Sequence, residues 1–485
     1  MVRRKRAWLL ANAATVLATA VAAGGTAGAS EAQSSTDVAD NRRLIEEIQG
    51  LQERIAELER RSATNARDSQ PHADLADAHR VDRTIADVVA DAERRSHLSL
   101  EGFTAGYSGG RFVIQSEDGN YLFSPSALVQ FRYVANFADG VSSDGDGSFE
   151  SGFEVRRLRL MFEGNFGSPN LSYFFQWNTG VNGGALVMDQ AWVRYAFAGT
   201  PFAVRFGAYV NGWDHETAVN IGRQLAVDRS VVNYVFSTGV TGVENYVQGI
   251  ELQYQAVDEW RASVMLHDGY LSRNTNFQNQ AATAPAIGIV NPGGGTAGRF
   301  EYKLAGDWRD YTDFTARGTK KDLLVVGGGF NFDTADNLNA LMYTADVQWE
   351  PSSVRGLSVY AAFVGMSRDF RSVPAGQTGS PNDWGFVAQA GYALSPAWEV
   401  FGRYSFTKLD DAGPGTLGNA ARVNDTIHEI AAGVNYYLMD HAAKFSLDVL
   451  FLPEGSPLDM PGIGIIAQPT ADPQAAIRAQ FQLAI

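Results

Sequence analysis

Arginine side chains gather in two short stretches of this sequence, and they are the residues best suited to bind a small anion. The first stretch holds Arg156, Arg157 and Arg159, and the second holds Arg194 and Arg205. A guanidinium group forms paired hydrogen bonds with a phosphate or a carboxylate. Carboxylates are also close in the sequence, so the same arginines could instead brace the fold through internal ion pairs. The acidic partners expected for bracing are Glu154, Glu163 and Asp189.

The patterns that covalent or metal chemistry needs are missing. The histidines form no HExxH pair, and no serine, histidine and aspartate have a spacing typical of a catalytic triad. Cysteine is absent, which excludes thiolate nucleophiles and cysteine-zinc sites. Asp144-Gly145-Asp146-Gly147 begins like a calcium loop but lacks the closing glutamate. The sequence therefore predicts no enzyme, no cofactor and no metal site.

The arginines lie within a series of strand-like runs that continues to the C-terminus. Near that end, apolar Ala479, Phe481 and Leu483 alternate with polar residues, as in a strand with one lipid face and one lumen face. Gaps between the runs are alternately short and long. Tight turns on one rim and long loops on the other predict an all-β, antiparallel outer-membrane barrel. About sixteen strands are expected, near 121–137, 149–166, 170–179, 185–198, 201–210, 247–257, 259–267, 297–306, 321–333, 338–350, 356–366, 383–394, 397–407, 424–438, 442–451 and 474–485.

Two segments between these strands require a separate explanation. Residues 307–320 are long where a tight turn is expected, and a helical plug on the short-turn side would account for them. Asn211–Tyr246 carries charges of both signs, including Asp214, Glu216 and Arg223. Folded into the channel, this loop would create a transverse field across a constriction. The alternative is a loop that caps the outer surface.

The residues before the barrel divide into three parts. Residues 1–29 have the basic start, apolar stretch and small residues of a cleaved secretory signal. Residues 30–95 are expected to form a periplasmic linker and a short coiled coil, and 96–120 a bridge with one pre-barrel strand over 111–117. The coiled coil could be a solvated spacer or could hold three chains together. Its seam has a 4-3-4-3 spacing and consists of Leu44, Ile48, Leu51, Ile55 and Leu58.

Three segments resemble the phosphate-selective porin O and P family. Phe153-Glu154-Val155-Arg156-Arg157-Leu158-Arg159-Leu160 is similar to the family's arginine strand near the start of the barrel. Ala432-Gly433-Val434-Asn435-Tyr436-Tyr437-Leu438 and Ile477–Leu483 resemble its last strands. The resemblance spans roughly 102–485. It implies a trimeric, 16-stranded outer-membrane porin, and some members pass phosphate or polyphosphate along arginine-lined pores.

Charge gives a second indication of what could pass. The formal net charge is -15, and removal of a leader with four basic residues and no acids makes it about -19 (-15 - 4), which argues against nucleic-acid binding. At the constriction, the arginines are expected to be nearly balanced by Glu154, Asp189, Asp214 and Glu216. This balance predicts a weak anion preference and no tight phosphate site.

We therefore interpret the sequence as an outer-membrane porin for passive diffusion of small hydrophilic solutes, with a possible anion or phosphate preference. The expected partners are outer-membrane lipid, two further copies of the chain and small solutes or anions. The alternative is a structural envelope protein with a plugged barrel and a periplasmic tethering stalk.

Overall fold

Antiparallel strands account for most of the computed structural model, which describes residues 102–108, 111–138, 149–180, 184–239, 246–269, 292–317, 321–336, 338–371, 379–410, 424–457, 460–465 and 470–485. The predicted signal peptide and coiled coil lie outside these residues. Among the described residues, no helix combines the length and apolar character needed to cross a membrane.

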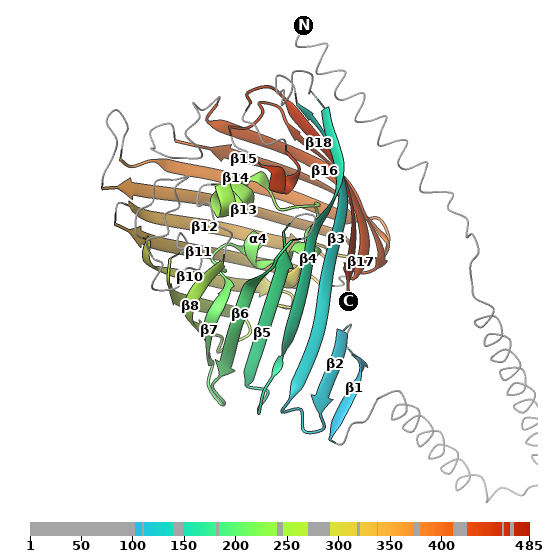
Figure 1. Cartoon of the computed structure of the whole chain (residues 1–485), viewed down its shortest axis with the longest axis vertical. Coiled ribbons are helices and arrows are strands. Elements are labelled where there is room, and N and C mark those ends of the chain that lie inside the picture. Colours follow the sequence, from blue (N-terminus) through green and yellow to red (C-terminus); the bar gives the residue numbers. More distant parts are fainter. Residues whose placement is uncertain are drawn as a thin grey trace, which may run out of the picture. The chain divides into compact units, whose positions relative to one another are not determined.

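A closed barrel is formed by β3 to β18 (Figure 1). The sheet has eighteen strands, and sixteen remain when β1 and β2 are set aside. Each strand from β3 onward pairs with the next, and β18 returns to β3 through pairs such as Ile477 with Ala135. The barrel strands are β3 Leu122–Ala138, β4 Phe149–Asn165, β5 Leu171–Thr179, β6 Leu186–Ala196, β7 Phe202–Val210, β8 Tyr246–Tyr254, β9 Trp260–His267, β10 Pro292–Ala305, β11 Leu323–Ala335, β12 Leu338–Glu350, β13 Leu357–Phe370, β14 Asn382–Ala393, β15 Trp398–Lys408, β16 Thr426–Met439, β17 Ala443–Leu452 and β18 Gln474–Ala484.

The predicted count of about sixteen strands is confirmed, and so is the all-β barrel. The segment before the barrel differs from the prediction, because it forms a hairpin of two strands. β1 (Phe103–Ser108) pairs with β2 (Arg111–Ser116) along its whole length. β1 was missed because a six-residue run with a central glycine shows too little alternation to be recognised. β2 continues the sheet onto β3 through Ile114 and Gln115 (Figure 1).

Alternation along the strands separates an outer apolar face from an inner polar one. In β15, Glu399 and Arg403 are buried on the inner face, whereas Trp398 and Val400 are exposed on the outer face. The same alternation was expected from the sequence for the last strand, β18. An apolar outer face suits contact with lipid, because a barrel leaves no backbone polar group unpaired toward it.

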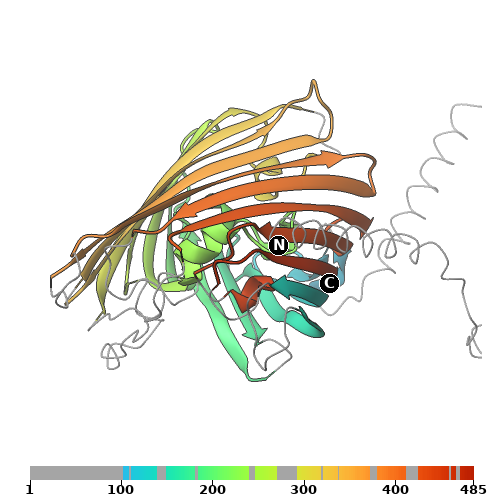
Figure 2. The same ribbon diagram turned by 90° about the horizontal axis from the view of Figure 1, so that it is seen from above.

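Three described segments fold into the interior of the barrel, and one of them is residues 460–465 after β17, which includes the 3-10 turn η5 (Pro461–Ile463). The first follows β7 and contains α4 (His215–Ala218), η1 (Ile221–Arg223), α5 (Val231–Tyr234) and η2 (Val235–Gly239). We call residues 211–239 the inward loop; its short helices lie within the ring of strands (Figure 2). The second segment is 307–317, on the short-turn side, with the single 3-10 turn η4 (Asp310–Thr312). A helical plug was expected there, but the segment is mostly irregular and is fixed by buried Tyr311 and Phe314.

Candidate functional site

The inward loop lies against one side of the barrel and leaves the other side open. Its backbone is held by wall side chains of β15 to β18: the Val227 amide donates to Asp448 Oδ2 at 3.0 Å, and the Val231 amide to Glu429 Oε2 at 2.9 Å. Apolar loop residues pack against the same wall. Because the inward loop covers this wall, the inward-facing side chains of these strands are buried. Further contacts to loop carbonyls come from Arg403, Asn435, Lys444 and Gln482.

Asp228 of the inward loop meets four guanidinium groups of the barrel wall. Its carboxylate lies 2.5 Å from Arg132 Nη1 and 2.9 Å from Arg157 Nη2, and within 4.0 Å of Arg156 and Arg478. Burial alone would raise the pKa of this carboxyl. The four guanidinium groups outweigh burial and hold the pKa of Asp228 well below its usual range. Asp228 is therefore a carboxylate at any physiological pH.

A β-bulge in β4 brings two adjacent arginines to the same side of the wall. Gln130 of β3 pairs with Arg157, but Phe131 pairs with Val155, so Arg156 is the extra residue. Strict alternation would send one of the two side chains outward. Instead Arg156 Nε donates to the Gly462 carbonyl at 2.9 Å, and Arg157 reaches Asp228. The sequence allowed both arginines to face inward only if such a bulge existed.

A cavity of about 650 Å³ separates the inward loop from β4 to β8, on the side of the long loops. We call it the loop-side cavity. Five arginines line it, against two acids, Glu163 and Asp228. Glu163 is paired with Arg111, and Asp228 with the cluster described above. The positive charge of this space is therefore only partly compensated. The lining arginines are Arg156, Arg157, Arg159, Arg205 and Arg229.

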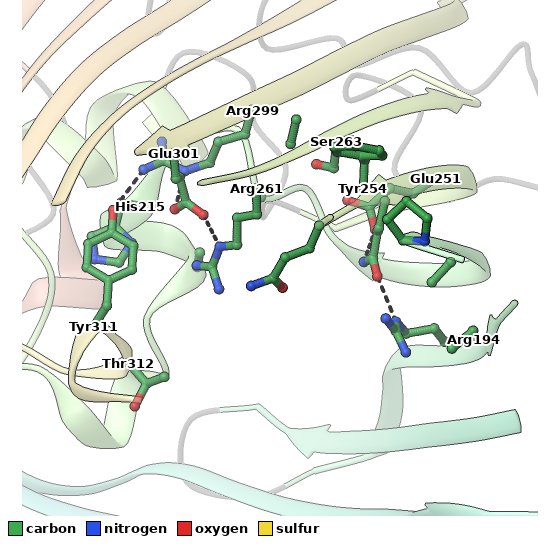
Figure 3. Close-up of a pocket in the computed structure, with 18 of the residues that line it drawn as sticks. Arg194, His215, Glu251, Tyr254, Arg261, Ser263, Arg299, Glu301, Tyr311 and Thr312 are labelled. Atoms are coloured by element: carbon green, nitrogen blue, oxygen red, sulfur yellow. Dashed lines mark hydrogen bonds and ion pairs between the residues drawn. The ribbon is translucent and has the colours of Figure 1, made fainter. Parts of the chain in front are cut away.

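A second cavity, of about 710 Å³, lies on the side of the tight turns, and we call it the turn-side cavity (Figure 3). Gly212, Ala218 and Asn220 of the inward loop border both cavities. Its charges are more evenly mixed, because Arg261 and Arg299 both pair with Glu301. The remaining charged side chains in its lining are Arg194, Arg223 and Glu251.

An aromatic contact joins the inward loop and segment 307–317 at this cavity. The His215 ring stacks on the Tyr311 ring with centroids 3.8 Å apart and an interplanar angle of 4° (Figure 3). Burial lowers the pKa of His215, so this imidazole is neutral at pH 7. The Tyr311 hydroxyl accepts a hydrogen bond from Arg299 Nη2 at 3.1 Å. The width of the turn-side cavity therefore depends on both segments.

A sequence profile described as phosphate-selective porin O and P matches residues 129–451, about two thirds of the 485-residue chain. The chain belongs to this family. It is an outer-membrane porin, a channel rather than an enzyme. The inward loop borders two cavities inside the barrel, which is the space that a channel uses.

Solved structures share the fold of this porin at low sequence identity. The anion-selective porin from Comamonas acidovorans is 11% identical with a TM-score of 0.50, covering 75% of this chain and 99% of that chain. The high-pH structure of Pseudomonas putida OprB is also 11% identical with a TM-score of 0.50, covering 76% and 95%. A comparison with curated proteins finds no match.

The structure places the predicted arginines of the porin beside water-filled space and moves most of the predicted acids away from it. Arg194 and Arg223 border the turn-side cavity, and the other four border the loop-side cavity. Glu154 pairs with Arg132, and Asp189 accepts a hydrogen bond from Gln176 at 3.0 Å. Arg156 and Arg157 meet Asp228, and Arg205 pairs with Glu251, so acids other than the three considered for bracing contact these predicted arginines. Their roles in solute passage stay predictions.

Asp214 and Glu216 serve the inward loop rather than the lumen. Asp214 caps α4, accepting from the Thr217 amide at 3.0 Å and from Asn233 at 2.7 Å. Both oxygens of Glu216 accept hydrogen bonds from Ser230, each at 2.7 Å. Burial, with a smaller effect of Asp214, raises the pKa of Glu216 to about 7, although Arg403 and Ser230 oppose it. Asp214 and Glu216 line neither cavity, so the near-neutral balance expected from the sequence loses two of its four acids.

Several charged residues at the site were not among the predicted ones. Arg132 and Arg478 complete the cluster around Asp228. Arg229 lines the loop-side cavity, and its guanidinium group is held there by hydrogen bonds to backbone carbonyls of the inward loop. For Arg478 the available signal was its position among the polar residues that alternate with Ala479, Phe481 and Leu483. For Arg132 the signal was alternation along β3. Nothing in the sequence indicated that a loop carboxylate would join them. Among the described residues, no three metal-ligating side chains lie together.

Proposed function

We propose that this porin passes small anions in preference to cations. The observation that supports the proposal is the lining of the loop-side cavity, where five arginines face two acids that already have arginine partners; Arg205 alone has a further acid among the described residues, Glu251. In a narrow space with low-dielectric walls, uncompensated guanidinium groups raise the local concentration of anions. Arg159 contributes most directly, because it donates a hydrogen bond to the Tyr246 hydroxyl at 3.4 Å and forms no ion pair with a carboxylate of the described residues.

Export and assembly complete the proposal. The basic and apolar start of the chain supports export by a cleaved signal peptide. The 4-3-4-3 seam from Leu44 to Leu58 supports a homotrimer. Family membership supports phosphate as one of the anions to be tested, although the scarcity of lysine in the barrel argues against a tight phosphate trap.

The test is the reversal potential of the purified porin in a planar bilayer under a KCl gradient. Wild type should give an anion-selective value. Arg156→Gln combined with Arg159→Gln should shift it toward cations, because two lumen charges are lost. The control is Arg355→Gln, an exposed arginine in the turn after β12, which should leave it unchanged. A cation-selective wild type would contradict the proposal.

A further inference from the structure

Two aromatic side chains stand on the lumen face of β5 and β6, where polar residues surround them. Phe174 and Trp192 are cross-strand partners, and their rings stack with centroids 5.6 Å apart and an interplanar angle of 23°. Both line the loop-side cavity. The next inward residues on one side are Gln176 and Gln190, which border the same water-filled space. A stacked aromatic pair facing water among polar side chains is a surface on which a planar ring can lie.

A guanidinium group with unused donors lies next to this pair. Arg194 is the next inward residue after Trp192 on β6, and its Nε donates to Gln253 Oε1 at 2.7 Å. Among the described residues, no carboxylate forms an ion pair with it. Arg194 is also opposite Arg205 in the sheet, and Glu251 pairs with Arg205 at 2.7 Å. Two guanidinium groups therefore share one acid. Arg194 borders the turn-side cavity (Figure 3), whereas Trp192, two residues before it, borders the loop-side cavity.

We propose that Phe174, Trp192 and Arg194 form a binding site for planar aromatic carboxylates. The ring of the solute lies on the aromatic pair, and its carboxylate accepts hydrogen bonds from Arg194. The inference rests on the proposed anion preference and adds the class of solute. Such a site suits conduction because it sits on one wall of an open lumen, from which a bound solute can leave.

The two rings do not have the same surroundings. Trp192 packs against the buried cluster that includes Tyr209 and Trp213, and Arg205 Cζ lies 5.5 Å from its ring centroid. It therefore also supports the wall. Phe174 is not part of that cluster, so its replacement is the cleaner test of ring binding.

The probe is benzoate added to the porin in a planar bilayer, and the measured quantity is the concentration that halves the chloride current. Cyclohexanecarboxylate has the same charge and a similar size but no planar ring. Benzyl alcohol has the ring but no charge. Benzoate should halve the current at a concentration about five to ten times lower than cyclohexanecarboxylate. Equal potency of these two would overturn ring binding, and equal potency of benzyl alcohol would overturn the carboxylate contact.

Variants then locate the site. Phe174→Leu should raise the half-blocking benzoate concentration about fivefold and leave cyclohexanecarboxylate unchanged. Arg194→Gln should raise the values for both acids about tenfold. The control is Trp177→Leu, an outward-facing tryptophan on β5 that packs against Phe162 and lines neither cavity. If Phe174→Leu behaves like this control, the site is disproved. The reversal potential of the same channels is measured in parallel. An anion-selective value together with failed benzoate block would disprove the binding site alone, whereas a cation-selective value would contradict the anion preference itself.

Discussion

Asp228 shows how a single carboxylate can both position a loop and set the charge of a lumen. It is buried, and four wall arginines surround it. Asp228→Asn keeps the shape of the side chain but removes the negative charge. We expect the reversal potential to move further toward anions. Because buried charges lose their partner, the inward loop should also be destabilised by about 3–5 kcal/mol.

Bilayer recordings and the temperature at which the folded band disappears on a gel measure the two effects. Asp440→Asn is the matched control, since Asp440 is an exposed acid in a turn whose positive φ of 50° asparagine tolerates. An unchanged reversal potential in Asp228→Asn would show that the loop charge does not contribute to selectivity.

Glu216 gives the inward loop a pH dependence. Its pKa is raised from 4.5 to about 7, chiefly by burial, so between these values the folded loop holds a proton that the unfolded chain has lost. Proton binding by Glu216 therefore adds to the free energy of unfolding of the loop. This contribution is fully present below about pH 4.5 and disappears as the pH rises through 7. Its size is on the order of 3 kcal/mol.

Single-channel recordings at pH 5 and pH 8 measure this effect as the frequency of brief current fluctuations. Wild type should fluctuate more at pH 8, and Glu216→Gln should lose that difference. Charged groups near Glu216 are Asp214, Arg403 and Arg229, and His215 adjoins it in sequence. A pH dependence that survives Glu216→Gln would assign the effect to one of these groups.

At the residue scale, the sequence predicted the arginines better than their partners. Arg156, Arg157 and Arg159 were expected at the lumen because a charged side chain facing lipid at mid-depth costs about 2–4 kcal/mol. Asp228, the partner of Arg156 and Arg157, is 71 residues from Arg157 in the sequence, and only the fold brings the two together. Asp214 and Glu216 were expected at the constriction, but capping and burial inside the loop decide their direction, and no sequence pattern reports that.

At the scale of elements, the bulge at Arg156 leads to a prediction about strand register. Deleting Arg156 should leave a regular β3–β4 ladder, because Arg157 already pairs with Gln130, and Val155 with Phe131. The variant should therefore fold and insert, with a reversal potential shifted toward cations by the lost charge. Heat-modifiable migration on a gel reports folding, and a bilayer recording reports the charge.

Deleting Leu158 instead provides the matched control for strand length. In that variant the regular ladder would send Arg157 to the outer face, at a cost of about 2–4 kcal/mol near mid-depth. We expect a clearly lower yield of folded protein than for the Arg156 deletion. Equal yields for the two deletions would show that the bulge does not control the direction of these arginines.

The strands themselves were largely predictable, because alternation of period two and turn residues mark both their faces and their ends. The predicted run 338–350 coincides with β12 (Leu338–Glu350). Alternation carries no information about segments 211–239 and 307–317. These segments are fixed by tertiary contacts such as the His215–Tyr311 stack, so their paths could not be derived from the sequence.

At the scale of the whole molecule, the alternation of loop lengths identified the barrel, whereas the net charge misrepresented the channel. The chain carries -15 overall, yet arginines outnumber acids in the lining of the loop-side cavity. A screening length of about 8–10 Å separates the lumen from charges elsewhere on the protein. We therefore expect selectivity to follow from the residues at the cavities rather than from the overall composition.

The described barrel is complete without the residues that precede β1. β18 closes on β3, and the similar porin from Comamonas acidovorans covers 75% of this chain while 99% of its own length is matched. Deletion of Asp37–Arg95 should therefore leave a folded barrel with an unchanged reversal potential, while the proposed trimer becomes less stable because the Leu44–Leu58 seam is lost. The mass of the native complex after mild detergent extraction is compared between the full-length protein and the deletion variant.

Leu51→Lys in the full chain tests the seam without shortening the chain. A full-length wild type that extracts as a monomer would contradict the trimer. A deletion variant that no longer folds would show that the N-terminal segment supports the barrel itself.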